Sequence, residues 1–457
     1  MRSDEPSTST VRFSRRTAGM ASIAASLALA GLGRSPRPAG AQDVTIRYQH
    51  WGSLAEKDAI TAVCEAYMEA NPTIRIDQQH IADTDDAYNT RLNTQVAAGE
   101  LPDVFQINEA RAMEWSEQGI ALDLSPYADQ YAGVIPQAKF FSAPGKLVGP
   151  MTGVETSLIF ANRDMFEQDG VALPPTTADT AWNWDQFVET AKAMTKDRSG
   201  RTAADPEFDP ESIQQYGITF PTWWLSWYPL IRSAGADLTD EAGMTYTLNS
   251  PEAIDVFQKM QDLVFVHHVA PTPTASEGLP ASAQQLLTRR VAMTIDGQWS
   301  LLDMNEAEVP LAIGVLPSLG TPTTVIVGAT TVINAQTQIV DQALAFHTFL
   351  NKTDQIMSLM TSGLWMPNET AYYTDDALIA SWIDNDSHPP EYRTAAVDYV
   401  FNNSVPGPIT IKGFPAIQSR LNAALDQVWD GSRPAADVLN EIAPEIQGML
   451  TGRYPSE

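Results

Sequence analysis

The segment VAMTIDGQWS, residues 291–300, places four residues with different binding chemistry next to one another, after a run typical of a buried strand. Asp296 and Gln298 supply hydrogen-bonding groups, Gly297 lets another group approach the backbone, and Trp299 supplies a flat apolar face. Such residues at the carboxyl end of a strand are typical of a ligand site in an α/β protein. They also suit a hairpin turn whose tryptophan packs in the core, so this segment alone leaves both interpretations open.

Tryptophan is frequent, with 11 residues in the chain, and several of them follow predicted strands. The segment FPTWWLSWYPLI comes after the strand YGITF, and Trp365 follows a glycine in TSGLWMPN. Aromatic faces, together with carboxylates and amides, are the groups that a neutral sugar ring and its hydroxyls require. Core packing is the alternative, and it is favoured for Trp227 and Tyr228 because they lie beside Pro229.

Carboxyl groups near strand ends leave a hydrolytic function open. Glu109, Glu155 and Asp296 lie near predicted strand ends, and a glycoside hydrolase uses two carboxyl groups about 5 to 9.5 Å apart. The sequence contains no G-x-S-x-G, H-E-x-x-H or C-x-x-C motif, and no glycine-rich phosphate loop. Adjacent histidines on a helix point in different directions, so the pair His267 and His268 predicts no metal site. No cofactor is expected.

Length, composition and charge limit the class of protein. A chain of 457 residues is too long for one core, so at least two domains or lobes are expected. Hydrophobic residues make up 44% of the sequence, as in a folded globular protein. Lys and Arg number 28 against 56 Asp and Glu, which gives a net charge of −28. This charge repels phosphate backbones and anionic lipids, so nucleic acid is excluded as a partner.

Residues 1–41 are predicted to be an export signal of the twin-arginine type. Arg15 and Arg16 precede a short alanine-rich apolar run, and cleavage is expected after Ala41. An ordinary secretory signal is the alternative, since Ala18 replaces a frequent phenylalanine. The protein is thus expected to be exported, to a periplasm or to the outer face of the cell membrane. No later apolar run reaches the about 20 residues that span a bilayer, and the one cysteine, Cys64, suits a buried apolar position.

From residue 43 onward, strand-like and helix-like segments alternate, which predicts a mostly parallel sheet with helices packed on it. The helical segment LAEKDAITAVCEAYMEANP lies between the strands VTIRYQHW and IRIDQQHI. In a second region, from about residue 157 to about residue 307, a long helix is predicted to start at Pro251 with Ser250 as its N-cap. The stretch from Asn351 onward is predicted to be mostly helical.

Six segments together resemble one known family: YMEANPTI, AAGELPDVFQI, PMTGVETSLIFANRDMF, LNSPEAIDVFQKMQDLV, RRVAMTIDGQWS and TSGLWMPN. They occur in the order found in extracellular solute-binding proteins of ABC importers, in the sugar-binding group with the maltodextrin- and glycerol-phosphate-binding proteins. The resemblance implies an α/β, periplasmic-binding-protein-like fold with two doubly wound lobes, joined by hinge strands around a ligand cleft. Lobe 1 is expected at residues 43–154 and about 311–350, and lobe 2 at about 155–310 and about 351–457.

The resemblance also implies which residues bind the ligand. Asp296, Gln298 and Trp299 would end a strand of lobe 2 and face the cleft, and Glu155 matches a sugar-binding glutamate in the crossing segment. The other expected ligand-binding residues are His50, Ser53, Tyr88, Asn108, Glu109, Arg111, Trp223, Trp224, Gly328 and Trp365. Leu421 stands where maltodextrin binders carry a tryptophan, which disfavours a long maltodextrin.

The function that the resemblance implies is capture of a mono- or oligosaccharide and its delivery to the transmembrane subunits of an ABC permease. The protein is expected to be a monomer and not an enzyme. One alternative is a binder of a phosphorylated polyol or another polar solute, for which Arg111 and Lys412 are the available cations. An alternative from another class is a secreted glycoside hydrolase.

Overall fold

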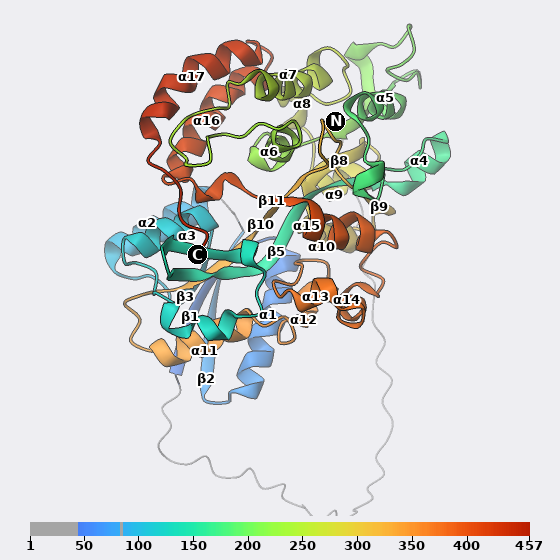
Figure 1. Ribbon diagram of the computed structural model, residues 1–457. Helices are drawn as coiled ribbons and strands as arrows, with labels where there is room; N and C mark the ends of the chain where they lie inside the picture. The colour runs from blue at the N-terminus through green and yellow to red at the C-terminus, as the bar shows by residue number, and fades with distance from the viewer. Residues whose placement is uncertain (1–43, 83–85) are drawn as a thin grey trace, which may run out of the picture. The chain divides into compact units, whose positions relative to one another are not determined.

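The computed structural model describes residues 44–82 and 86–457, so the predicted export signal lies outside the described residues. In this part of the chain, eleven strands form one sheet in the order β2-β1-β3-β10-β5-β8-β7-β6, with β11, β4 and β9 attached beside it (Figure 1). The strands are β1 (Val44–Trp51), β2 (Ile74–Ile81), β3 (Val104–Ile107), β4 (Lys139–Ala143), β5 (Lys146–Asn162), β6 (Lys196–Asp197), β7 (Ile213–Thr219), β8 (Val291–Gly297), β9 (Leu311–Gly314), β10 (Thr324–Ile333) and β11 (Ser404–Pro406).

The sheet is mixed, so the prediction of a mostly parallel sheet is wrong. β1 pairs in parallel with β2 and β3, and β7 with β8, as alternating strands and helices predict. β5 and β10 run antiparallel to each other and to their other main-sheet neighbours, β8 and β3. For β4 and β5 the reason is local, because a tight turn through Gly145, with φ of 69°, joins them as an antiparallel hairpin.

β5 changes its partners along its length. Residues 151–156 of β5 pair with β10, whereas residues 157–162 pair with β8 and β9. One strand therefore belongs to two groups of strands, as expected of a strand that joins two lobes. The residue boundaries of the lobes given above stay a prediction.

Helices cover the sheet and confirm several predictions. The α-helices are α1 (Leu54–Ala70), α2 (Asp86–Ala98), α3 (Glu109–Glu117), α4 (Arg163–Asp169), α5 (Trp184–Met194), α6 (Trp224–Ser233), α7 (Pro251–Phe265), α8 (Pro273–Ser276), α9 (Ser282–Leu287), α10 (Ser300–Glu306), α11 (Val340–Leu350), α12 (Met357–Thr361), α13 (Ala371–Thr374), α14 (Asp376–Ile383), α15 (Tyr399–Asn403), α16 (Phe414–Trp429) and α17 (Ala435–Met449). The short helical segments are η1 (Ser125–Tyr131), η2 (Pro136–Ala138), η3 (Ala178–Thr180), η4 (Pro210–Ser212), η5 (Arg393–Asp398) and η6 (Pro408–Thr410). Ser250 caps α7 as predicted, accepting a hydrogen bond from the Ala253 amide. None of the described helices has the length and hydropathy to cross a membrane.

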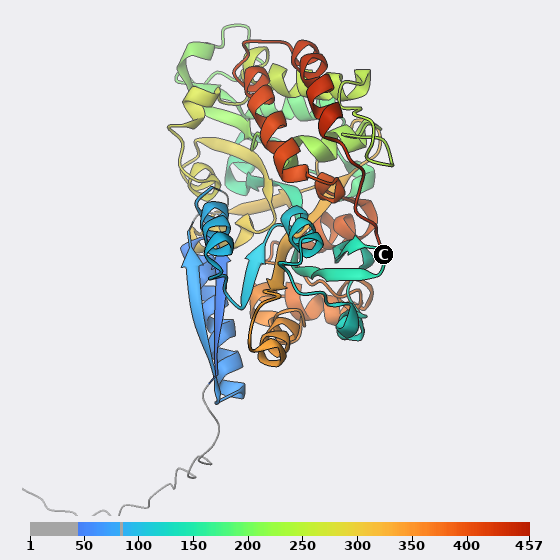
Figure 2. The same cartoon turned by 90° about the vertical axis from the view of Figure 1, so that its left-hand side faces the viewer.

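The core contains the aromatic residues for which packing was favoured. Trp227 and Tyr228 are each 1% exposed, and the Trp227 ring lies 5.1 Å from that of Phe257 in α7. Cys64 is buried in α1, also as predicted. Figure 2 shows the neighbouring helices α16 and α17, which contact α7 as well as each other.

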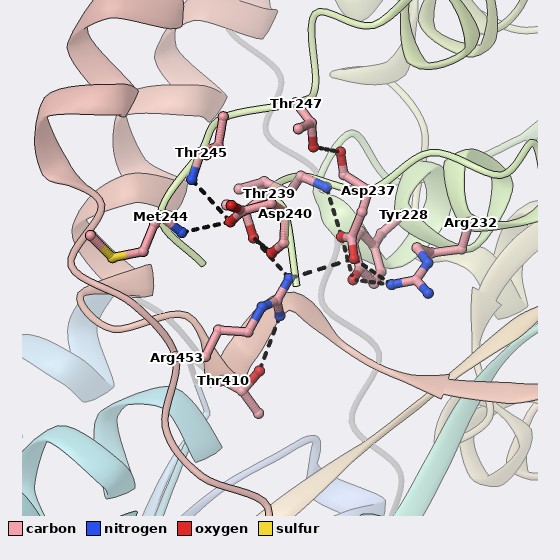
Figure 3. Close-up of polar contacts among 11 residues, drawn as sticks. Tyr228, Arg232, Asp237, Thr239, Asp240, Met244, Thr245, Thr247, Thr410 and Arg453 are labelled. Carbon is pink, nitrogen blue, oxygen red and sulfur yellow. Dashed lines mark hydrogen bonds and ion pairs between the residues drawn. The ribbon is translucent and has the colours of Figure 1, made fainter. Parts of the chain in front are cut away.

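A polar network holds the loop after α6 (Figure 3). The Asp237 carboxylate accepts hydrogen bonds from Tyr228 and Arg232 of α6 and from Arg453. Arg453 also donates to Thr239 at 2.8 Å and to Thr410 at 3.2 Å. Residues of widely different sequence position thus meet at this loop.

The C-terminal strap, residues 451–454, continues from this loop to α3. The Tyr454 hydroxyl donates to the Glu117 carboxylate at 3.1 Å, and the Lys412 ammonium lies 2.9 Å from the other oxygen of the same carboxylate. The Lys412 ammonium also lies 4.9 Å from the centre of the Tyr454 ring. The strap therefore connects the loop after α6 with the end of α3.

Candidate ligand-binding site

The N-terminus of α1 meets α10, the helix that follows the VAMTIDGQWS segment. Ser53 and Glu56 form a capping box, in which the Ser53 oxygen accepts from the Glu56 amide and the Glu56 carboxyl accepts from the Ser53 amide. The Ser53 hydroxyl donates to the Asp303 carboxylate at 2.9 Å. This contact joins the N-cap of α1 to α10.

A second convergence involves α3, β10 and β5. Glu109, the first residue of α3, accepts a hydrogen bond from the Gly328 amide of β10 at 2.8 Å. The neighbouring residue of β10, Val327, lies opposite Glu155 of β5. A Cβ atom at Gly328 would lie 2.0 Å from the Gly153 carbonyl oxygen, so glycine is required for the close pairing of these strands. The Gly328 backbone was expected to contact ligand, and in the structure its amide donates to Glu109.

Five carboxyl groups from different elements form what we call the acidic network: Glu56, Glu109, Glu155, Asp296 and Asp303. Burial raises the pKa of both Glu56 and Glu109 to about 7. Burial also raises the pKa of Glu155 well above its ordinary value, and the nearby Glu56 and Glu109 raise it further. For Asp296, burial is again the main cause of a raised pKa, with a smaller contribution from Asp303. Repulsion thus acts between Glu155 and both Glu56 and Glu109, and between Asp303 and both Glu56 and Asp296.

The pKa of Glu109 predicts how stability changes with pH. Burial moves this pKa from 4.5 to about 7, so between these values the folded protein holds a proton that the unfolded chain has released. This contribution to the free energy of unfolding is fully present below pH 4.5 and is lost as the pH rises to about 7. In Glu109→Gln, whose amide oxygen can still accept from Gly328, the melting temperature should fall less over this range. An identical pH dependence in the two proteins would contradict the raised pKa.

Two tryptophans beside the acidic network keep part of their surface exposed. Trp299 lies two residues after the end of β8, and its indole folds back over Gly297, where a Cβ atom would come within 2.1 Å of the ring. The rings of Trp299 and Trp223 are stacked, with centres 6.3 Å apart and planes 25° apart. Trp299 is thus packed at the margin of the core, with part of its surface exposed.

Gln298 and Trp365 are fully buried beside this pair. The Gln298 amide nitrogen donates to the Gly363 carbonyl and the Tyr392 hydroxyl, both at 2.9 Å. Trp365 is 1% exposed and packs on Gly153, where a Cβ atom would lie 2.2 Å from the indole. Its main role in this conformation is packing of the turn after α12 against β5.

Two residues that were expected to contact ligand, His50 and Tyr88, are buried in the protein interior. His50 is fully buried, and its two ring nitrogens contact the Trp51 carbonyl and the Gln78 amide, while burial lowers its pKa to about 4. The Tyr88 hydroxyl donates to the Gln106 carbonyl at 2.8 Å. Their polar groups are therefore already used by the protein.

Trp224 and Arg111 also have protein partners. Trp224 is 4% exposed and packs edge-on against Phe414. Arg111 donates to the Asn93 side chain at 3.0 Å. Asn108, by contrast, is partly exposed, and its side chain makes no hydrogen bond within the described part of the chain. Asn108 precedes Glu109 and so borders the acidic network.

Sequence reasoning missed Glu56, Asp303 and Trp51. Glu56 is the last residue of SLAE, which has the pattern of a helix capping box. That pattern accounts for a glutamate at this position and gives no indication that it belongs to the acidic network. Asp303 follows Asp296 by seven residues, and only the turn of α10 brings it toward α1. Trp51, partly exposed at the end of β1, packs edge-on against Tyr88 with ring centres 5.1 Å apart. Within residues 44–82 and 86–457, no cluster of His, Cys, Asp or Glu has metal-binding geometry.

Comparison with known proteins adds to this geometry. The family described as bacterial extracellular solute-binding protein matches residues 51–357. An arabinooligosaccharide-binding protein of Halalkalibacterium halodurans is 26% identical over 191 residues, which is 41% of this chain and 38% of that relative.

Two solved structures share the fold. One is an ABC substrate-binding protein of Listeria monocytogenes in complex with cycloalternan, with a TM-score of 0.76 and 21% identity, covering 89% of this chain and 99% of the other. The second is a maltose-bound protein of T. maritima, with a TM-score of 0.74 and 19% identity, covering 89% of this chain and 100% of the other. The predicted α/β, periplasmic-binding-protein-like fold is confirmed by these likenesses.

Proposed function

The chain belongs to the family of bacterial extracellular solute-binding proteins, and we propose that its solute is a mono- or oligosaccharide bound for an ABC importer. The protein would capture the sugar between its two lobes and deliver it to the transmembrane subunits of the permease. Under this proposal the protein is a monomer and performs no catalysis.

The observation that carries the proposal is the partly exposed stack of Trp299 and Trp223 beside the acidic network. The apolar face of a sugar ring packs on an indole, while its hydroxyls need hydrogen-bond partners around the rim. Asp296, three residues before Trp299, and Asn108 supply such partners. The names of similar proteins support the same reading, since they include an arabinooligosaccharide binder, a cycloalternan complex and a maltose complex.

The partners of Arg111 and Lys412 disfavour a phosphorylated polyol as the ligand. A phosphate group needs cationic partners, and the two cations considered for it are engaged elsewhere. Arg111 donates to Asn93, and Lys412 pairs with Glu117. The acidic network would also repel a phosphate.

Export of the protein follows from the same proposal. The bacterial extracellular family suits a protein that leaves the cytoplasm. We propose that the arginine pair at residues 15 and 16 directs this export through the twin-arginine route, to the periplasm or the outer face of the membrane. The division into lobes at about residues 154 and 310 is likewise part of the proposal.

A thermal-shift screen with carbohydrates tests the proposed function. A sugar present at a hundred times its Kd should stabilise the folded protein by about 2.7 kcal/mol and raise its melting temperature. Polyol phosphates and amino acids serve as controls that should give no shift. The sugar should be recovered intact after incubation, because release of reducing sugar would favour a glycoside hydrolase. A shift with polyol phosphates alone would contradict the proposal.

A further inference from the structure

The backbone of the C-terminal strap is fixed to segments of the proposed lobe 2. The Gly452 amide donates to the Gly243 carbonyl in the loop after α6, and Arg453 pairs with Ile411 in a short antiparallel bridge. The Arg453 side chain also donates to Asp237 of that loop (Figure 3). The strap continues from α17, which packs against α7 and α16. Any movement of lobe 2 should therefore carry the strap with it.

Glu117, which contacts the strap, ends a helix of the proposed lobe 1. This helix, α3, packs against β4 and β10. The Ser116 and Ser142 hydroxyls of α3 and β4 share a hydrogen bond at 2.9 Å, and the Lys146 ammonium of β5 donates to the Ser116 carbonyl at 2.7 Å. α3 also contacts η6 and α16, so it lies at the boundary between the proposed lobes.

The Glu117 carboxylate connects the two proposed lobes. Lys412 donates to one of its oxygens at 2.9 Å and Tyr454 to the other at 3.1 Å. The hydrogen bond from Lys412, followed by that from Tyr454, lowers the pKa of Glu117, so the carboxylate is charged at neutral pH. Among the ion pairs of residues 44–82 and 86–457, only the pair of Lys412 and Glu117 crosses the proposed boundary between the lobes.

We propose that Glu117, Lys412 and Tyr454 form a latch, which holds the two lobes in the described arrangement before a ligand binds. This inference rests on the proposed function, because it requires two lobes that move relative to each other. The strap is fixed to lobe 2 and α3 to lobe 1, so opening of the cleft breaks both hydrogen bonds to Glu117. The latch thereby lowers the free energy that a ligand must supply to keep the lobes together.

Distances between two spin labels test the latch in the unliganded protein. Glu69→Cys in α1 and Glu252→Cys in α7 place one label on the exposed surface of each proposed lobe, while the native Cys64 is buried. Lys412→Met and Tyr454→Phe each remove one partner of Glu117 and keep most of the packing of the side chain. Each variant should raise the ratio of the open to the described arrangement about fivefold, and the double variant should raise it further.

Lys259→Met is the matched control for these variants. Lys259 pairs with Asp255 in the same helix, α7, and this pair is exposed to a similar degree as that of Lys412 and Glu117. Its loss changes the net charge as Lys412→Met does, but it breaks no contact between the lobes. The distribution of label distances should therefore stay as it is in the unaltered protein.

The outcomes separate the latch from the proposed function. Label distances that are the same in Lys412→Met, Tyr454→Phe and Lys259→Met would overturn the latch. A sugar that raises the melting temperature would then still support sugar binding. If the thermal-shift screen finds no carbohydrate ligand, the proposed function fails, whereas the label distances still decide whether the contacts of Glu117 hold the lobes together.

Discussion

Trp299→Ala is expected to weaken sugar binding about 30-fold or more. Aromatic anchors of this kind contribute about 2 kcal/mol or more, and each 1.4 kcal/mol is about a tenfold change in affinity. The indole folds over Gly297 and is partly exposed, with its ring stacked near that of Trp223. Because the side chain is not enclosed by the core, its removal should leave most of the folding free energy intact. Calorimetric titration and thermal melting of the same variant measure the two quantities.

The conservative variant Trp299→Phe sharpens this experiment. Phenylalanine keeps an aromatic face and should recover part of the affinity, whereas alanine should not. A large loss of stability in Trp299→Ala, with normal affinity in the folded fraction, would mean that the indole serves the core. In that case the interpretation of VAMTIDGQWS as a plain turn would be the correct one.

Trp365→Ala is expected to lower the free energy of unfolding by about 3 to 5 kcal/mol, the range typical of removing a buried tryptophan. Trp365 is 1% exposed and packs on Gly153 of β5, next to the backbone hydrogen bonds that join Met366 to Val154. Loss of the indole leaves a cavity at the strand that the two groups of strands share. Urea denaturation of the variant and of the unaltered protein measures the difference.

This result also decides between two roles for Trp365. It was expected from sequence to contact ligand, whereas the described conformation buries it. If the unfolding free energy changes by less than about 1 kcal/mol while sugar affinity collapses, the indole would have to reach the ligand in another conformation. That outcome would contradict the packing role.

Much of the fold could be predicted because the signals are local. β1 and β2 have the bounds that their alternating residues indicate, and the Ser250–Pro251 pair marks the start of α7. The first half of β5 was less visible, because Gly149, Pro150 and Gly153 interrupt its pattern. Gly153 is tolerated because β5 pairs closely with β10 there and packs against Trp365, both of which are distant in sequence, whereas Gly149 and Pro150 pair with β4.

The candidate site could be predicted only in part, for a similar reason. Asp296 and Trp299 carry a recognisable strand-end motif, and the structure places Asp296 on β8 opposite Leu158 of β5. Sequence position cannot distinguish a strand-end histidine that faces a ligand from one whose nitrogens bind the protein, as those of His50 do in the structure. Asp303 joins the site only through its contact with Ser53, 250 residues earlier in the chain.

The C-terminal strap has a consequence for the order in which the chain folds during synthesis. Glu117 receives the Tyr454 hydroxyl from 337 residues later, and Asp237 receives Arg453 from 216 residues later. A ribosome adds about 5 to 20 residues per second, so many seconds pass between the synthesis of each carboxylate residue and that of its partner. During that interval α3 and the loop after α6 can form, but they cannot be tied to each other through the strap. Until the strap residues have left the ribosome, the contacts of Tyr454 with Glu117 and of Arg453 with Asp237 cannot form. A chaperone or export machinery that binds incompletely folded chains could therefore still recognise this part of the molecule.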